Sequence, residues 1–88
     1  MKYPEEQKLL HRAKQLQPEA LAMVYDLYST PVYRYAHRLL GDNNLAEDCV
    51  ADVFDRFLTA MNQGGGPQTH LRAYLYRMAH NWIVDHYR

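Results

Sequence analysis

Apolar residues recur at intervals of three and four along most of this chain, and that spacing limits its fold more than any other feature. Residues three and four apart share one face of an α-helix, so each such stretch predicts a helix that buries one side. No stretch of useful length alternates apolar and polar residues as a half-buried strand would. Since 88 residues have room for one modest core, we expect an all-α fold in a single domain over residues 1–88, a small bundle of four to five helices.

Proline residues mark the expected starts of the first helices. The spacing predicts a helix over residues 5–16, and Pro18 then begins a second one, because the first turn of a helix needs no N–H from that position. Thr30 followed by Pro31 is typical of a cap and a first-turn proline. The second helix is therefore expected to kink or restart at that point.

Glycine residues mark the other boundaries. Gly41 is typical of a helix end, and the next helix is expected over residues 45–61, with several cap choices in residues 42–44. A glycine-rich connection follows over residues 62–68. Thr69 is then expected to cap a last helix that runs to the end of the chain.

The helix expected over residues 45–61 separates two kinds of side chain. Its apolar residues cluster on one face: Ala46, Val50, Val53, Phe54, Phe57 and Met61. Asp48, Asp52 and Asp55 fall on nearly the opposite face. This pattern predicts an amphipathic helix with a buried apolar side and an acidic outer side.

The last helix carries two stripes. Its expected core face comprises Leu71, Leu75, Met78, Ala79 and Trp82. Its second stripe comprises Arg77, Asn81, Val84 and Arg88, with Tyr74 at the edge. Arginine neutralises phosphates, asparagine reads base edges and aromatic rings stack on bases, so this stripe favours binding of single-stranded nucleic acid. The alternative is that these side chains belong to the core or simply face solvent.

Net charge does not by itself favour a nucleic-acid partner, since ten basic and ten acidic side chains cancel. Their distribution is uneven. Residues 42–56 hold five acids against Arg56, whereas residues 66–88 hold three arginines against Asp85. The two segments are therefore predicted to face different partners, unless both are ordinary solvated helix faces.

Spacing argues against several kinds of chemistry. His80 and His86 are six residues apart and do not share a helix face, and Cys49 has no second cysteine near it, so no metal site is expected. The acids near Cys49 would raise the pKa of its thiol, which disfavours a nucleophile. The glycine-rich connection lacks the Lys-Ser/Thr pair of a phosphate-binding loop. We expect no metal, no cofactor and no enzymatic activity.

The chain is expected in the cytoplasm. Its single cysteine allows no intrachain disulfide. No apolar run approaches the roughly 20 residues that span a bilayer. The N-terminal MKYPEEQKLLHRAKQL lacks the apolar segment of a signal peptide. We therefore expect no membrane partner.

Two signatures in the second half of the chain resemble a known family. AEDCVADVFDRFL, followed by the glycine-rich loop and then by LRAYLYRMAHNWIVDHYR, resembles region 2 of the extracytoplasmic-function (ECF) sigma factors, within the sigma-70 family. The upstream ALAMVYDLYSTPVYRYAHRLLGD is similar to that family's opening helices. The resemblance covers residues 18–88, and the helix over residues 5–16 adds little to it. It implies the fold of sigma factor region 2 and a role in transcription initiation.

The resemblance implies that the helix matching residues 45–61 docks RNA polymerase core through the coiled coil of the β′ subunit. By this resemblance Asp48 and Asp52 are docking residues, and Asp55 and Ala51 belong to the same expected surface. The family usually has glutamine where this chain has Ala51, so one hydrogen bond is expected to be lost. An acidic surface suits a basic partner.

The resemblance also implies that the last helix, with the loop before it, recognises the non-template strand of the promoter −10 element. Arg77, Asn81 and Asp85 match the family's recognition positions, although Asp85 lies toward the core side and an anchoring salt bridge is its alternative role. The loop over residues 62–70 is expected to form the wall of a pocket for an extruded base. It contains no Phe, Tyr or Trp, so stacking there must come from His70 or from the helix.

The expected partners are therefore RNA polymerase core, promoter DNA and an anti-sigma factor. Family members normally continue into a helix-turn-helix domain, and this chain stops inside its last predicted helix, so we expect a fragment that lacks that domain. The alternative is a helical adaptor that keeps the fold and binds proteins without reading DNA. Zero net charge and a loop without large aromatic residues favour this alternative.

Overall fold

The computed structural model describes the backbone of residues 2–88 and the side chains from residue 5 onward. This part of the chain contains four α-helices and no strand: α1 (Lys2–Lys14), α2 (Pro18–Leu40), α3 (Asn43–Asn62) and α4 (Leu71–His86). The all-α prediction is confirmed, with four helices. None of these helices is long and apolar enough to cross a bilayer.

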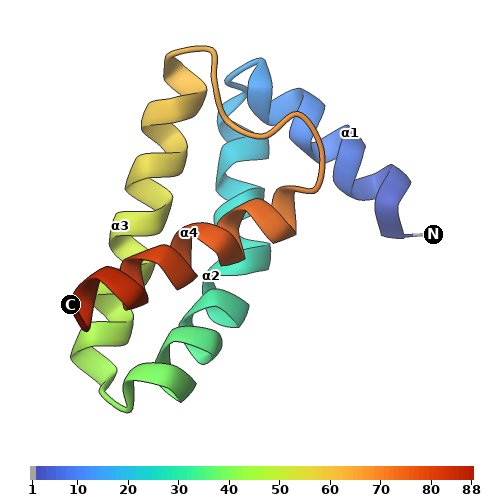
Figure 1. The fold of residues 1–88 in the computed structure, drawn as a ribbon. Helices are drawn as coiled ribbons and strands as arrows, with labels where there is room; N and C mark the ends of the chain where they lie inside the picture. Colours follow the sequence, from blue (N-terminus) through green and yellow to red (C-terminus); the bar gives the residue numbers. More distant parts are fainter. Residues whose placement is uncertain (1) are drawn as a thin grey trace.

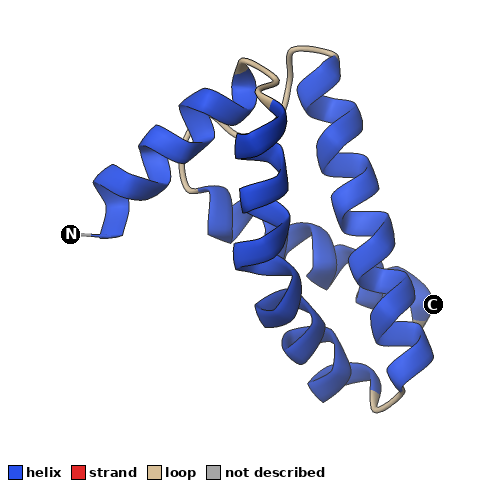
Figure 2. Ribbon diagram, turned by 180° about the vertical axis from the view of Figure 1, so that it is seen from behind, coloured by secondary structure: helices blue, strands red, loops and turns tan. Residues whose placement is uncertain are grey.

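α2 and α3 form an antiparallel pair that is joined by a tight turn after Leu40 (Figures 1 and 2). α4 lies across one face of this pair and contacts both helices (Figure 1). α1 contacts α2 and α4 at the end of the pair where α2 begins and α3 ends. The loop that leads from α3 to α4 therefore passes close to the C-terminal end of α1.

The apolar faces predicted from the spacing meet in one core. Every apolar residue expected on the inner side of α3 is buried. The expected core face of α4 is buried except at Met78 and Trp82, which are half-buried at its edge. Cys49 and Ile83 are buried as well, because the apolar stripe of a core-facing helix is wider than a single row of residues.

α2 continues through Pro31 without a restart, and the expectation of a break there is wrong. The proline lacks the N–H that would bond to the carbonyl oxygen of Leu27, one turn earlier. Leu27 is 53% exposed, so it lies on a side of the helix where water can bond to that oxygen. Tyr28 and Val32 are buried on the core side, and their packing outweighs the lost hydrogen bond.

The predicted boundaries of the helices are confirmed in part, and α4 ends at His86 instead of running to the end of the chain. Pro18 lies in the first turn of α2, and Gly41 ends that helix with φ of 68°, its N–H bonded to the carbonyl oxygen of His37. Thr69 does not cap α4. His70 holds the cap position in the left-handed conformation, with φ of 57° and no side-chain cap bond. The Thr69 hydroxyl lies 2.8 Å from Nδ1 of His70 instead.

α1 begins and ends earlier than the expected helix over residues 5–16. Its apolar stripe is buried, namely Leu9, Leu10 and Ala13. Glu6 is also buried, and the hydroxyl of Tyr28 in α2 donates to its Oε1 at 2.9 Å. Burial and this hydrogen bond raise the pKa of Tyr28 to about 12. α1 is therefore fastened to α2 by apolar packing and by one buried polar contact.

Candidate functional site

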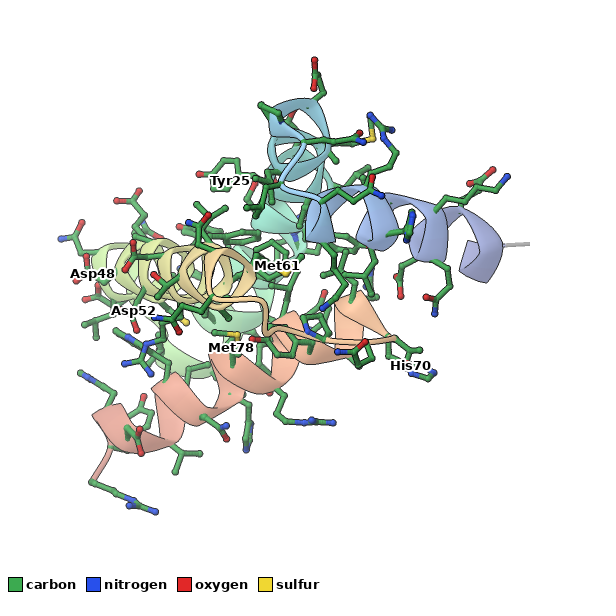
Figure 3. The ribbon with its side chains drawn as sticks, turned by 90° about the horizontal axis from the view of Figure 1, so that it is seen from above. Tyr25, Asp48, Asp52, Met61, His70 and Met78 are labelled. Carbon is green, nitrogen blue, oxygen red and sulfur yellow. The ribbon has the colours of Figure 1, made fainter. Side chains whose placement is uncertain are left out.

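The outer side of α3 carries the residues expected to dock a partner. Asp42 caps this helix, since its carboxylate accepts a hydrogen bond from the N–H of Leu45 at 2.9 Å. The acidic surface is defined here as Asp48, Ala51, Asp52 and Asp55. All are exposed except Asp52, which is half-buried, and Figure 3 shows Asp48 and Asp52 on the side of α3 that points away from α1. Carboxylates on a capped, core-packed helix are held in fixed relative positions.

One carboxylate of the acidic surface already has a partner. Nε of Arg56 lies 2.8 Å from Oδ2 of Asp52, one turn earlier on the same helix. The Arg56 side chain is 69% exposed, and such exposed pairs stabilise a helix by about 0.3–0.5 kcal/mol. A basic partner must therefore compete with Arg56 for Asp52, whereas no ion pair to Asp48 or Asp55 is found within the described residues.

Ala51 also borders a groove between α2 and α3. The groove has a volume of about 380 Å³, and its lining includes Tyr25, Tyr33 and Val50. The ring of Tyr25 packs edge-on against Phe54 at 5.0 Å between ring centroids, yet half of the residue is exposed. The small Ala51 side chain leaves this groove open. Sequence reasoning missed Tyr25, although an aromatic residue outside the apolar stripe of its helix was a signal for it.

α4 and the loop before it carry the residues expected to read a base. Arg77, Asn81 and Arg88 are exposed, as the second stripe predicted. Asp85 is exposed as well, so the expectation that it lies toward the core side is wrong. Arg77, Asn81 and Asp85 are divided between two depressions, whereas Arg88 lies beyond the end of α4 and lines neither. Arg77 lines a pocket of about 340 Å³, called the loop pocket here, with residues 67–70, Ala73 and Tyr74.

Asn81 and Asp85 line a separate groove of about 330 Å³ between α3 and α4. Asp52 and Arg56 lie across from them on α3, so this groove joins the acidic surface to α4. No ion pair from Asp85 is found within the described residues, and the side chain is exposed. Among the side chains that the structure describes, the anchoring salt bridge considered for Asp85 does not form.

The aromatic rings of α4 are largely engaged with neighbouring rings. Tyr74 is half-buried and packs against Phe57, with 6.3 Å between ring centroids. Trp82 was expected in the core, but it is half-buried and stacks on His86 with an interplanar angle of 2°. The Trp82–His86 pair forms part of the lining of the α3–α4 groove, and sequence reasoning missed His86. The spacing of four residues between Trp82 and His86 was the signal that the two rings share one helix face.

His70 stands at the mouth of the loop pocket. Figure 3 shows it on the loop just before α4, projecting outward from the body of the protein. Its left-handed backbone turns the loop into α4 without a side-chain cap. Its imidazole is exposed, and a role in stacking stays a prediction.

Cys49 is a core residue. It is fully buried, with its Sγ 3.9 Å from the carbonyl oxygen of Ala79 in α4. Burial, and secondarily the charge of Asp52, raise the pKa of the thiol to about 11. At neutral pH the group is therefore a protonated thiol that packs as a small apolar side chain. Among the described residues, no cluster of three metal-binding side chains is found.

Comparisons with known proteins identify a family. The Sigma-70 region 2 family matches residues 24–88, which is well over half of the chain. Over 81 residues the chain is 31% identical to the ECF RNA polymerase sigma factor BldN of Streptomyces coelicolor, an alignment that covers 92% of this chain. The chain spans 31% of the length of that relative. No solved structure matches it.

The family match covers both surfaces described above. It begins within α2 and extends through α3, the loop and α4 to the last residue. α1 lies outside it. The resemblance to the sigma-70 family that the two sequence signatures predicted is confirmed: the chain belongs to the Sigma-70 region 2 family.

Proposed function

We propose that this chain docks RNA polymerase core through the acidic surface of α3 and reads the non-template strand of the promoter −10 element with α4 and the loop before it. The observation that carries this proposal is that the two sets of side chains lie on different helices of one framework and meet only along the α3–α4 groove. The acidic surface occupies the outer side of α3, whereas the arginines, Asn81 and the loop pocket lie on and beside α4.

The docking part of the proposal rests on exposed charge. Asp48 and Asp55 are exposed, and they project from a helix that needs no rearrangement to present them. Complementary charge mainly raises association rates and excludes wrong partners. The open groove beside Ala51 offers an apolar contact next to these charges, in place of the hydrogen bond that a glutamine would make. The proposed partner is the coiled coil of the β′ subunit.

The reading part rests on the loop pocket. Extrusion of a base from the stack costs a few kcal/mol, which contacts to that base must offset. The half-buried ring of Tyr74 and the imidazole of His70 offer flat surfaces, and Arg77 supplies a cation for the adjacent phosphate. Asn81 is one helical turn further along, where it can contact the edge of a neighbouring base.

Binding to DNA is proposed to depend on the polymerase. The formal net charge of the chain is zero, so the electrostatic part of its DNA affinity is small. Docking raises the effective concentration of the loop pocket at the promoter and thereby compensates for this weakness. The proposal places the chain in the cytoplasm, where the polymerase works, with an anti-sigma factor as a further partner.

The docking proposal is tested by binding of the chain to a β′ coiled-coil fragment. We expect Asp48→Arg and Asp52→Arg each to weaken binding by about tenfold or more, because a like charge then faces the basic partner. Glu5→Arg makes the same charge change on α1, which does not border the acidic surface, and serves as the control. Equal affinities for all three variants would rule out the acidic surface as the docking site.

A helical adaptor that binds proteins without reading DNA is the second candidate. The neutral charge and the absence of Phe, Tyr and Trp from the loop favour it. The two candidates differ in one observable. If the chain shows no base preference on single-stranded −10 DNA even with polymerase core present, while it still binds the coiled coil, the adaptor is the correct function.

A further inference from the structure

The loop over residues 63–70, which forms one wall of the loop pocket, has backbone support at its two ends. At the α3 end, the N–H groups of Gly64 and Gly65 donate to carbonyl oxygens of the last turns of α3, at 3.1 and 2.8 Å. At the α4 end, the carbonyl oxygen of His70 accepts a bond of 3.0 Å from the first turn of that helix. Pro67 has no N–H, and no backbone hydrogen bond from the N–H groups of Gly66, Gln68 and Thr69 is found in the described part of the chain. The middle of the loop therefore needs support from side chains.

Lys14, the last residue of α1, supplies that support. Its Nζ donates to the carbonyl oxygen of Gly65 at 2.9 Å and to that of Pro67 at 3.1 Å. The two carbonyl groups flank Gly66, so one ammonium group holds the chain on both sides of the loop's middle. Hydrogen bonds from a charged donor are stronger than neutral ones, and the half-buried Lys14 is partly shielded from water.

The helix that carries Lys14 is itself fixed in place. Leu9, Leu10 and Ala13 bury the inner side of α1, and the Tyr28 hydroxyl holds Glu6 near its other end. Pro67 is buried where the loop meets this part of the fold. Lys14 can restrain the loop only if the helix that carries it is itself held in place. α1 meets this condition through contacts at both of its ends.

We propose that Lys14 is a positioning residue for base reading: α1, outside the family match, holds the loop in the shape that forms the pocket. This inference rests on the proposed function of the loop pocket and extends it. Lys14 acts through Gly65 and Pro67 rather than by contact with DNA. Residues 67–70 line the loop pocket, and the two bonds from Lys14 position this segment.

Three substitutions in the full chain separate positioning from other roles. Lys14→Met keeps the apolar stem and removes the donors, whereas Lys14→Arg keeps charged donors at the same place. Lys8→Met removes an exposed lysine from the same helix and is the matched control. Far-UV circular dichroism and thermal unfolding establish that each variant keeps the helical fold.

The first measurement is amide hydrogen exchange in the absence of any partner. In Lys14→Met we expect exchange at Gly64 and Gly65, the loop glycines whose N–H groups donate backbone hydrogen bonds, to rise by about tenfold, because the loss of the charge-assisted bonds to the neighbouring carbonyl groups lowers the free energy of local opening. Exchange within α3 should stay unchanged. Lys14→Arg should restore most of the protection, and Lys8→Met should match the unsubstituted chain.

The second measurement uses polymerase core and single-stranded DNA that carries either the preferred −10 sequence or single-base changes. In Lys14→Met we expect the ratio of the affinity for the preferred −10 sequence to the affinity for the altered sequences to fall by about tenfold. The slope of log affinity against log salt should stay the same. A direct phosphate contact would instead lower that slope by about 0.7 for each lost charge and leave the ratio unchanged. Affinity for the β′ coiled coil should not change.

The outcomes distinguish the inference from the function on which it rests. Unchanged loop exchange in Lys14→Met, or a reduced salt slope with full base preference, overturns the positioning role alone. If the unsubstituted chain with polymerase shows no base preference, the proposed function fails, and the reading role of Lys14 fails with it. Loss of loop protection and of base preference in Lys14→Met, with rescue by Lys14→Arg, supports the inference.

Discussion

α3 carries the acidic surface on a helix that Asp42 caps at its first turn and that buries one whole side in the core. The loop pocket, by contrast, lies at the start of α4, where His70 offers no side-chain cap and the wall is a loop that Lys14 tethers from outside. The first surface is therefore local and stiff, and the second depends on contacts between distant parts of the chain. A substitution can disturb base reading and leave docking intact, while damage to the shared core removes both.

The largest expected effect comes from Phe57, which is almost fully buried in α3 and packs against Tyr74 in the loop pocket. Phe57→Ala should lower the free energy of unfolding by about 3–5 kcal/mol, because it opens a cavity in the core between α3 and α4. Urea unfolding followed by circular dichroism measures this loss. Leu58→Ala changes an exposed neighbour and should cost less than about 1 kcal/mol. Equal losses of unfolding free energy in the two variants would mean that Phe57 is not packed in a core.

A substitution at Asn81 should affect reading without affecting docking. Asn81→Ala is expected to reduce discrimination between bases by about 1–3 kcal/mol, because a contact to a base edge is lost. Arg77→Ala should weaken binding to all sequences and lower the salt slope by about 0.7. Val84→Ala, on the same exposed stripe, is the control. These effects are measured by titration of polymerase-bound chain with single-stranded −10 DNA, and unchanged base preference in Asn81→Ala contradicts its reading role.

Two glycines of the loop test how tightly it is packed. Gly64 and Gly66 both have positive φ, 79° and 85°, so an alanine at either position should cost about 1 kcal/mol. A Cβ at Gly66 would lie 2.7 Å from Sδ of Met61, whereas none of the described atoms lies within 4 Å of one at Gly64. Gly66→Ala should therefore cost about 1 kcal/mol more than Gly64→Ala in urea unfolding. Affinity for the β′ coiled coil should be equal in both variants. A lower affinity in Gly66→Ala alone would show that docking also depends on the loop.

The smallest expected effect concerns Arg56, which is paired with Asp52 of the acidic surface. Arg56→Ala should lower the free energy of unfolding by only about 0.3–0.5 kcal/mol, since its pair with Asp52 is exposed. The same change frees Asp52 for a basic partner, so binding to the β′ coiled coil should become slightly tighter. Arg34→Ala removes an exposed arginine from α2 and is the control. Weaker binding in Arg56→Ala would indicate that Arg56 itself contacts the partner.

Local patterns along the chain were enough to predict the helical segments, their buried sides and the acidic outer side of α3. Helical periodicity is a local property, because residues three and four apart meet on one face whatever the rest of the chain does. Phe57 and Leu75 were therefore recognisable as core residues, and Asp48 as an exposed one. The family signatures depend on the same local stretches, and for this reason they identified the family before the tertiary structure was considered.

Tertiary structure alone decided how the loop pocket is assembled. It kept α2 continuous through Pro31, placed His70 rather than Thr69 at the start of α4, and separated Arg77 from Asn81 into different depressions. The contact of Lys14 with Pro67 joins residues 53 positions apart, and no local pattern encodes such a pair. A loop has no repeating hydrogen bonds of its own, so its shape follows from the elements packed around it.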